Sequence, residues 1–387
     1  MQIGLIINPI AGIGGSVGLK GSDGAEIQQQ ALALGAQPQS QRRAALALEA
    51  LLPLRDSFEL VTPPGDMGET VARECGFSPH PLPLPRGGMG ESPAPFGRGA
   101  RGEGETTTAA DTIFSAQWMA SRPVDLLLFA GGDGTARDIS SVVGTKIPVL
   151  GIPAGVKIHS AVFATHPRAA GEIAAAFIRG EKLSIREAEV IDLDEETYRA
   201  GTVITRLYGY LRVPNLAQRL QNKKAPTPAG EAVRAEAIAA AVTESMQPGW
   251  LYILGPGTTT RAIADKLGFP KTLVGVDVYT REDVVALDVS AARLLELLAD
   301  RPAKIIVTPI GGQGFIFGRG NQQISPAVIQ KVGRENIIVV SLSEKLNALK
   351  GAPLLVDTGD PSVDEMLAGY LPVIVGYKDK VVYRILA

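Results

Sequence analysis

The sequence predicts an α/β fold with two parts: an N-terminal doubly wound parallel-sheet domain and a second, β-rich α+β domain. Over residues 1–180, short apolar runs alternate with helix-forming segments, the pattern of a parallel sheet covered by helices. From Leu183 onward, polar and apolar residues alternate as in antiparallel strands. Glycine-rich loops directly follow five of the predicted strands. We therefore expect one domain at 1–180 and another at 181–387.

Length, composition and net charge limit the classes of protein to which this chain can belong. The chain has 387 residues, of which 45% are hydrophobic and 20% charged, as in globular proteins of one large or two ordinary domains. A net charge of −2 gives no support for a nucleic-acid or membrane partner. The single cysteine, Cys75, excludes an intrachain disulfide. With no signal-peptide pattern and no run of roughly 18 apolar residues, we expect a cytoplasmic protein. We also expect it to be a homo-oligomer and to act on small molecules.

The first domain is predicted from short apolar strands that alternate with helical segments. An unusual segment at 79–105, rich in proline, glycine and arginine, cannot contribute to a packed core and is predicted to be a low-complexity insertion. The predicted strands are 3–7, 58–62, 124–130 and 147–152, and the predicted helices are 41–52, 66–75, 107–119, 135–143 and 167–179.

The second domain is predicted to open with two antiparallel strands and a linker at 222–230. An alanine-rich helix at 231–246 follows, and the last two strands form a hairpin. The predicted strands are 185–194, 203–213, 250–254, 273–279, 284–288, 304–308, 337–341, 353–357, 373–375 and 381–386, with a further helix at 291–298.

The loop after the third strand carries the strongest functional signal. Gly131, Gly132 and Gly134 allow positive φ and leave no Cβ to block a ligand. A helix starting near Thr135 would present its N-terminus to an anion. Asp133 would repel phosphate there unless it holds a cation or accepts a proton from a substrate hydroxyl. The alternative interpretation is a tight turn with an aspartate cap.

The first strand is followed by Asn8 and a long glycine-rich loop. It contains Gly12, Gly14, Gly15 and Lys20, but it is not a P-loop, since glycine follows the lysine. An open backbone with one lysine has the ingredients of an anion-binding loop. The alternative is a flexible solvated loop.

The loop after the fourth strand contains Gly155, Lys157 and His159. In a parallel sheet it would lie beside the loop of Asp133, so Lys157 could meet a phosphate or the Asp133 carboxylate. The chain has only three histidines, which argues against a metal cluster at His159. We interpret His159 as a hydrogen-bonded residue at a helix start.

The loop after the predicted strand at 250–254 repeats the arrangement of strand, glycine turn and helix. It suggests a second anion site built from backbone N–H groups and threonine hydroxyls, and the alternative is a capped helix without a ligand. The glycines of the loop after the predicted strand at 304–308 also suit a backbone that faces a ligand. The residues that we expect to contact nucleotide or phosphate are Gly255, Gly257, Thr258, Thr259, Gly311, Gly312 and Gln313, with Arg319 and Asn321 available for further polar contacts.

Phosphoryl transfer fits this inventory of residues. It needs phosphates held by backbone dipoles, a divalent metal, and a group that orients or deprotonates the acceptor hydroxyl. Asp133 is the residue we expect in that last role, as catalytic base, as ligand of Mg²⁺, or as both. Arg137 and Asp138 are weaker candidates, because a surface ion pair on the helix explains them as well.

The segment Gly131-Gly-Asp-Gly-Thr135 resembles the signature of the ATP-dependent NAD kinase superfamily, which includes diacylglycerol and sphingosine kinases and, more distantly, phosphofructokinases. The loops at 8–24, 151–157, 255–260 and 309–315 extend the resemblance to the ATP-NAD kinase-like branch, which also contains proteins associated with acetoin catabolism. The resemblance spans nearly the whole chain apart from 79–105.

This resemblance implies a ligand cleft between an α/β domain and a β-rich domain. It also implies ATP as phosphoryl donor and the adenosine-ribose 2′-hydroxyl of NAD as acceptor, giving NADP and ADP, with the signature aspartate at Asp133. The chain departs from NAD kinases in one respect. Their Asn-Glu or Asn-Asp pair has no counterpart at Asn215, which leucine follows, or at Asn222, which lysine follows.

Two further functions stay open. One is a kinase with a different acceptor, such as a sugar or a lipid head group. The other is a nucleotide-binding regulatory protein without catalytic activity, which would not need a carboxylate among phosphates. A Rossmann dehydrogenase is disfavoured, because the first glycine loop lacks the Gly-x-Gly-x-x-Gly spacing that leads directly into a helix.

Overall fold

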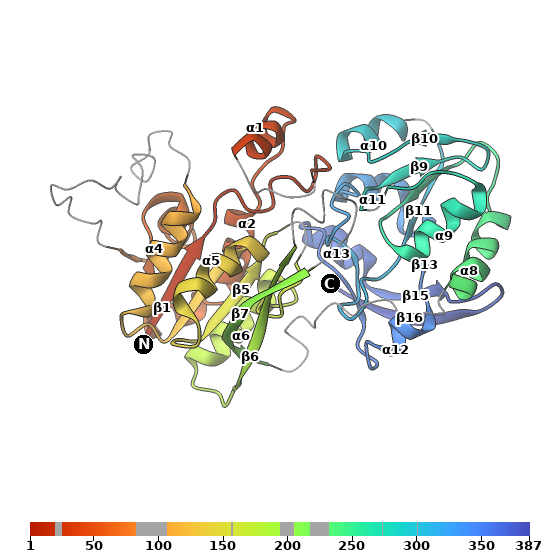
Figure 1. Ribbon diagram of the computed structural model, residues 1–387. Helices are drawn as coiled ribbons and strands as arrows, with labels where there is room; N and C mark the ends of the chain where they lie inside the picture. The colour runs from red at the N-terminus through yellow and green to blue at the C-terminus, as the bar shows by residue number, and fades with distance from the viewer. Residues whose placement is uncertain are drawn as a thin grey trace. The chain divides into compact units, whose positions relative to one another are not determined.

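The computed structural model describes residues 1–19, 25–82, 107–155, 158–193, 205–216, 232–272, 274–299 and 301–387. The chain forms two compact units (Figure 1). The N-terminal unit consists of Met1–Ile13 and Gln37–Gln221, and the C-terminal unit of Gly14–Ala36 and Asn222–Ala387. The division therefore follows Gln221, whereas the sequence-based boundary followed residue 180, and a segment of the first glycine loop belongs to the C-terminal unit.

The N-terminal unit contains the predicted parallel sheet. All pairings in the sheet are parallel. Strand β3 (His80–Pro81) was not predicted, because it lies inside the segment predicted to be an insertion. Pro81 is tolerated there because β3 is the edge strand of the sheet. Residues 83–106 lie outside the described residues. In spatial order the strands are β5 (Val149–Pro153), β4 (Leu126–Gly131), β1 (Gln2–Ile7), β2 (Glu59–Thr62) and β3 (His80–Pro81).

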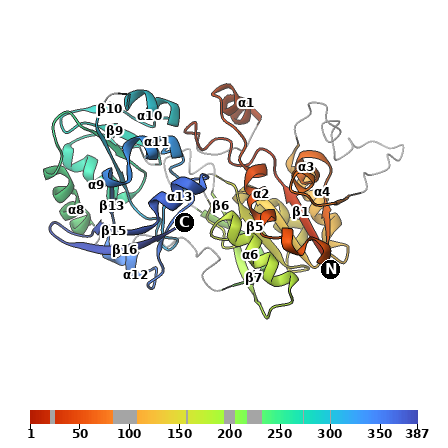
Figure 2. The same cartoon turned by 180° about the vertical axis from the view of Figure 1, so that it is seen from behind.

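Helices cover both faces of this sheet (Figures 1 and 2). Every residue of β4 is buried, which explains why the strand is a continuous apolar run rather than an alternating one. One face carries α2 (Ser40–Glu49), α3 (Glu69–Glu74) and α6 (Pro167–Ile178), and the other carries α4 (Ala109–Ala120) and α5 (Asp133–Val143). Short 3₁₀ turns lie at Leu52–Ser57 and Gly65–Met67.

A long antiparallel hairpin completes the N-terminal unit. Its strands are β6 (Ser184–Leu193) and β7 (Thr205–Asn215), as the alternating pattern predicted. The hairpin packs against α5, and the Ala161 N–H donates to the Glu189 carbonyl over 3.0 Å. These strands were expected to begin the second domain, but they belong to the first compact unit.

The C-terminal unit contains a mixed sheet, in agreement with the predicted β-rich domain. Its centre is parallel, formed by β8, β11, β13 and β15, and antiparallel pairings join β9 to β8 and β16 to β15. In spatial order the strands are β10 (Val284–Ala286), β9 (Asp277–Tyr279), β8 (Leu251–Leu254), β11 (Ala303–Val307), β13 (Ile337–Val340), β15 (Gly369–Ile374), β16 (Lys380–Leu386), β14 (Leu354–Val356) and β12 (Phe315–Phe317).

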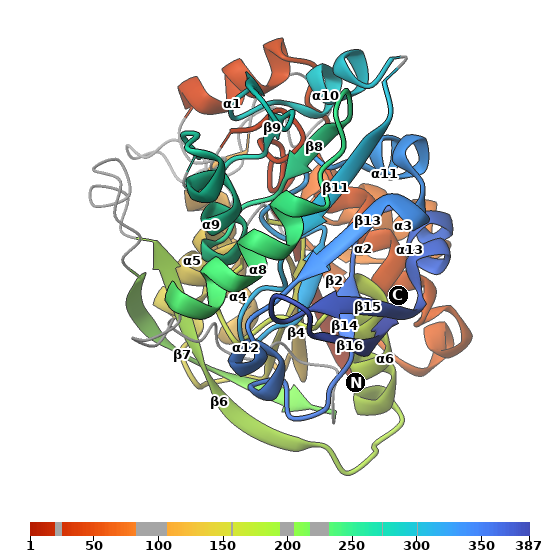
Figure 3. The same ribbon diagram turned by 90° about the vertical axis from the view of Figure 1, so that its right-hand side faces the viewer.

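Two apolar clusters lie on opposite faces of this second sheet. Leu251 and Ile253 point into one cluster, whereas Tyr252 and Leu254 point into the other, as the period of a strand requires. The face of Tyr252 is covered by α8 (Ala232–Glu244) and α9 (Thr258–Leu267) (Figure 3). The opposite face is covered by α10 (Ala291–Leu297), α11 (Pro326–Val332) and α13 (Pro361–Leu367).

Several short elements of the C-terminal unit were not predicted. They are β12, α11, α13, α1 (Ala25–Ala33), α12 (Ser343–Asn347) and a 3₁₀ turn at Arg334–Asn336. The predicted linker at 222–230 lies outside the described residues. Across the described ranges, no helix combines the length and the apolarity needed to cross a membrane.

Candidate active site

Three loops of the N-terminal unit begin side by side at one edge of its sheet. Ile7 of β1 pairs with Ala130 of β4, and Gly131 of β4 pairs with Pro153 of β5. The strand order changes direction between β1 and β4, since β2 and β3 lie on one side and β5 on the other. Ligands of open α/β sheets bind beyond the carboxyl ends of the strands at such a switch point. The loops that follow these three strands form the candidate site.

Asn8 connects two of these loops. Its main-chain N–H donates to the Ala130 carbonyl over 2.9 Å, and its side-chain Nδ2 donates to Thr135 Oγ1 over 2.9 Å. Its Oδ1 accepts from the Ile10 N–H over 3.3 Å. The sequence placed both Asn8 and Thr135 in a nucleotide-binding site, and the structure brings them into direct contact.

Asp133 is the first residue of helix α5 and is buried, with 5% of its surface exposed. Its Oδ2 accepts from the His159 N–H over 2.7 Å and lies 3.1 Å from His159 Nδ1. Its Oδ1 accepts from the Ser160 N–H over 3.0 Å. The helix begins earlier than the predicted start at Thr135, so the carboxylate also benefits from the positive end of the helix dipole.

The buried carboxylate is therefore compensated by the protein itself. We expected Asp133 to need a cation or the proton of a substrate hydroxyl, and the loop after β5 supplies two backbone N–H groups and an imidazole. His159 is hydrogen-bonded, as interpreted, but it lies in a loop and not at a helix start. Ser160 was not among the residues expected in this site. The adjacency of loops in a parallel sheet was the signal that could have identified both residues.

Ser160, His159 and Asp133 do not form a nucleophilic triad. The Ser160 hydroxyl donates to the Ile191 carbonyl over 2.8 Å and accepts from the Ile191 N–H over 2.9 Å. The hydroxyl therefore fixes the loop to strand β6 and is not directed at the His159 ring.

Arg137 and Asp138, one turn along α5, form ion pairs. Arg137 Nη1 lies 2.9 Å from Asp192 Oδ2, and its Nε lies 3.6 Å from Asp138 Oδ1. These contacts agree with the alternative of an ion pair on the helix and give no support for a catalytic role.

The glycines of this site serve close packing. Gly132 has a φ of −116°, and neither Gly131 nor Gly134 has a positive φ, so the expectation of left-handed backbone there was wrong. A Cβ on Gly131 would lie 2.4 Å from Thr135 Oγ1, and a Cβ on Gly155 would lie 2.7 Å from the Cα of Gly132. Only a residue without a side chain allows these loops to approach so closely.

The first glycine loop divides between the two units. Gly12, in the N-terminal unit, has a φ of 79°, and a Cβ there would lie 2.1 Å from the Ala154 carbonyl oxygen. Gly14 and Gly15 belong to the C-terminal unit, where the Ala291 N–H donates to the Ser16 carbonyl over 3.0 Å. Lys20 and Lys157, the lysines expected to meet phosphate, lie outside the described residues.

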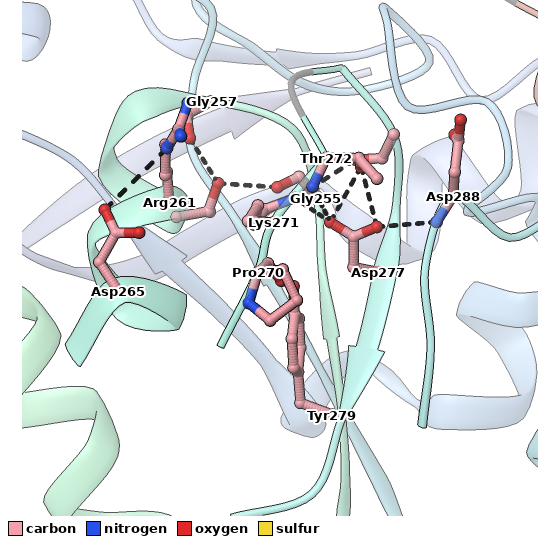
Figure 4. Close-up of polar contacts among 12 residues, drawn as sticks. Gly255, Gly257, Arg261, Asp265, Pro270, Lys271, Thr272, Asp277, Tyr279 and Asp288 are labelled. Carbon is pink, nitrogen blue, oxygen red and sulfur yellow. Dashed lines mark hydrogen bonds and ion pairs between the residues drawn. The ribbon is translucent and has the colours of Figure 1, made fainter. Parts of the chain in front are cut away.

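The turn after β8 forms the predicted helix N-terminus in the C-terminal unit (Figure 4). Gly257, with a φ of 131°, precedes Thr258, the exposed first residue of α9. The Thr260 hydroxyl donates to the carbonyls of Gly255 and Gly257 over 2.7 and 2.9 Å. The Thr259 hydroxyl, which is buried, accepts from Lys345 Nζ over 3.3 Å. Lys345 was not among the residues expected at this turn.

The loop after β11 closes on itself. The N–H groups of Gln313 and Gly314 donate to the Ile310 carbonyl, so they point into the turn. Gly311 is half-buried, and Gly312 is buried with a φ of 78°. The two residues expected to offer further polar contacts are engaged within the fold. Arg319 forms a buried ion pair of 2.9 Å with Asp357, and the Asn321 amide binds the backbone of 316 and 318.

A buried ion pair that the sequence analysis missed joins Lys271 to Asp277 over 2.8 Å (Figure 4). Asp277 also accepts from Thr272 and from the Asp288 N–H. Burial lowers the pKa of the Lys271 ammonium. Burial alone would raise the pKa of Asp277, but Lys271 and the other donors outweigh it and lower that pKa. Lys271 Nζ also donates to the Gly275 carbonyl over 3.3 Å, so this cluster braces the loop before β9.

The chemistry of the candidate site is that of a nearly buried carboxylate at a helix N-terminus. In the part of the chain that the structure describes, no three His, Cys, Asp or Glu side chains form a metal-binding group. Magnesium bound mainly by nucleotide phosphates and water would need only one or two carboxylates from the protein. Asp133 Oδ1, which accepts a single hydrogen bond among the described contacts, retains capacity for a hydroxyl or a metal ion.

Comparison with known protein families gave two matches. The ATP-NAD kinase N-terminal domain matches residues 3–182, and the ATP-NAD kinase C-terminal domain matches residues 249–385. The first match contains the three loops of the candidate site, and the second contains the turns after β8 and β11. A search of curated proteins found no match.

Proposed function

The chain belongs to the ATP-NAD kinase family, and on that premise we propose that it transfers the terminal phosphoryl group of ATP to a hydroxyl of NAD or a related metabolite. With NAD as acceptor the products are NADP and ADP. One observation carries the proposal: the Asp133 carboxylate is held at the N-terminus of α5, at the switch point of the sheet, with Oδ1 still able to accept a bond. This is where a group that receives the acceptor proton is needed.

In this proposal the residues of the N-terminal unit divide the work. Asp133 Oδ1 accepts the proton of the acceptor hydroxyl as the new bond to phosphorus forms, or it holds Mg²⁺ beside that hydroxyl. Asn8 and Thr135, joined by their hydrogen bond, keep the loops after β1 and β4 in place. When bound, ATP supplies the phosphoryl group and Mg²⁺ offsets the charge on its phosphates.

We propose that helix N-termini in both units bind phosphate. In the N-terminal unit, the first N–H groups of α5 lack partners within the helix and favour an anion. The same argument applies to α9, where Thr258 and Thr259 begin the helix. The ligand cleft between the two domains, which the sequence resemblance implied, also stays a prediction.

The experiment that tests this function combines purified protein, ATP, Mg²⁺ and NAD, and detects NADP with an NADP-specific dehydrogenase. We expect NADP to form, and we expect Asp133→Asn to remove turnover while ATP binding persists. If no NADP forms, transfer of labelled phosphate to a panel of sugars, nucleosides and lipid head groups determines whether another acceptor is used. Absence of transfer to any acceptor contradicts the proposal.

A second candidate function has one observation in its favour. Among the described residues, three groups of the protein contact the Asp133 carboxylate, and the side chain keeps only 4% of its surface exposed. A carboxylate used only to hold the loop after β5 in place would suit a nucleotide-binding regulatory protein. That protein would bind ATP or NAD without turnover, and calorimetric titration with each nucleotide, beside the kinase assay, distinguishes the two functions.

A further inference from the structure

The two oxygens of Asp133 are not equivalent. Oδ2 faces two donors from one residue, the main-chain N–H of His159 at 2.7 Å and its ring Nδ1 at 3.1 Å. Oδ1 accepts from the Ser160 N–H alone among the described contacts, at 3.0 Å. Each carboxylate oxygen has two lone-pair directions, so Oδ2 is saturated and Oδ1 has one direction left.

The chemistry of the contact determines which group carries the hydrogen. An ionised carboxylate has no hydrogen to donate, so the ring nitrogen that faces it must be the donor. His159 Nδ1 therefore bears a hydrogen whether the ring is neutral or cationic. In the neutral ring Nε2 is then unprotonated. Nδ1, which already donates to Oδ2, cannot also remove a proton from a substrate, so through this nitrogen the ring acts on Asp133.

The segment that holds the carboxylate is itself anchored. The Ser160 hydroxyl makes two hydrogen bonds to the backbone of Ile191 in β6, at 2.8 and 2.9 Å. The His159 side chain is buried, with 7% of its surface exposed. Rotation of the Asp133 carboxylate would break the bonds from His159 and Ser160 together. Its orientation is therefore set by a segment fixed to another strand.

We infer that His159 is a positioning residue, which saturates Asp133 Oδ2 and so makes Oδ1 the oxygen that meets the acceptor hydroxyl. The inference rests on the proposed kinase function. The reaction itself needs nothing from the imidazole: the hydroxyl proton passes to Oδ1, the hydroxyl oxygen forms the bond to phosphorus, and the bond to the ADP oxygen breaks.

Two variants of nearly equal shape test this inference. In His159→Asn the amide nitrogen occupies the place of Nδ1 and can still donate, whereas His159→Leu places a methyl group there. We expect His159→Leu to lower kcat by roughly tenfold to a hundredfold, as loss of orientation does, with KM for ATP and NAD changed by less than about threefold. We expect His159→Asn to recover most of that loss.

Two kinetic outcomes would overturn the inference. Equal loss in both variants would mean that the imidazole itself takes part in proton transfer. No loss in His159→Leu would mean that the orientation of Asp133 does not matter for the reaction.

A measurement without turnover separates this inference from the proposed function. In protein carrying ¹⁵N-labelled histidine, the neutral ring of His159 should show a hydrogen on Nδ1 and none on Nε2. The opposite tautomer refutes the contact on which the inference depends. If no acceptor is phosphorylated, the proposed function fails, and the effect of His159 on the reaction fails with it. The tautomer still decides whether His159 holds the carboxylate.

Discussion

The side-chain amide of Asn8 donates to the hydroxyl of Thr135 over 2.9 Å, which joins residues 127 positions apart in the chain. Asn8 follows the end of β1, and Thr135 lies in the first turn of α5 after β4. The contact therefore joins the segments that follow β1 and β4, at the carboxyl ends of the two strands between which the sheet order changes direction. It also fixes the start of the helix on which Asp133 lies.

Asn8→Ala should weaken this junction. The buried Thr135 hydroxyl would lose its donor and the Ile10 N–H its acceptor, a cost of about 1 to 3 kcal/mol in the free energy of unfolding. Urea denaturation measures this, and KM for ATP should rise because the loop after β1 is released. The matched control is Asn347→Ala, on the exposed side of α12, which should leave both quantities unchanged. Equal effects of the two variants would contradict the proposed junction.

Asp133→Asn should reduce kcat by about 10² to 10⁴, the usual contribution of a general base. The amide keeps the shape of the carboxylate and one oxygen acceptor, so ATP binding by calorimetry should change little. Asp56→Asn, at a side chain with 96% of its surface exposed, is the control and should retain full activity. Turnover by Asp133→Asn at the wild-type rate would remove Asp133 from the mechanism.

Gly12→Ala should destabilise the protein more than Gly35→Ala. The two glycines have nearly the same φ, 79° and 78°, so any side chain is strained at either position. At Gly12 a Cβ would also lie 2.1 Å from the Ala154 carbonyl oxygen, whereas at Gly35 nothing lies within 4 Å. We expect about 1 kcal/mol for Gly35→Ala and roughly 1 to 3 kcal/mol more for Gly12→Ala, measured by urea denaturation. Equal losses in the two variants would show that the loop after β5 moves away from the Cβ at position 12 with no cost in the free energy of unfolding.

Removal of one partner of the Lys271–Asp277 pair should be costly. Lys271→Met leaves a buried carboxylate without its cation and should cost about 3 to 5 kcal/mol in the free energy of unfolding. Adding Asp277→Asn removes that charge, so the double variant should lose less than the sum of the single variants. The control cycle uses the exposed pair Arg293–Glu296, with side chains 55% and 64% exposed, where the coupling should be below about 1 kcal/mol. Additive losses at Lys271 and Asp277 would contradict a coupled buried pair.

The same pair predicts a loss of stability in acid. The folded-state pKa of Asp277 lies below its ordinary value, so the unfolded chain takes up the proton first as pH falls. The contribution of Asp277 is therefore complete above about pH 4, the ordinary aspartate value, and is lost as pH falls through the lower folded-state pKa. Between pH 5 and pH 3 or so, the urea midpoint should fall more steeply for wild type than for Asp277→Asn. Parallel slopes would argue against the lowered pKa.

Much of the fold was predictable because the signals are local. The strand at 124–130 is a short apolar run of the kind buried on both faces, and β4 is observed at Leu126–Gly131. The alternating pattern at 185–194 and 203–213 correctly predicted an antiparallel pair. The short helices α11, α12 and α13 were missed, because five to seven residues are too few to show a helical period.

The candidate site was predicted in its position and less well in its chemistry. The glycine loop after β4 was correctly identified as the N-terminus of a helix. The expected positive φ at Gly131, Gly132 and Gly134 was wrong, because close approach of the neighbouring loop and not backbone conformation requires these glycines. Nothing local in the sequence indicated that His159 donates to Asp133, since 26 residues separate the two.

By itself, the sequence determined the α/β class, the alternation of strands and helices, and the family to which the chain belongs. These depend on the apolar period and on short motifs, which are properties of neighbouring residues. Only the tertiary structure decided that segment 14–36 belongs to the C-terminal unit, that Lys271 and Asp277 meet in the core, and that the Asp133 oxygens differ. Each of these depends on contacts between residues distant in the chain, and such contacts exist only once the strands have paired in register.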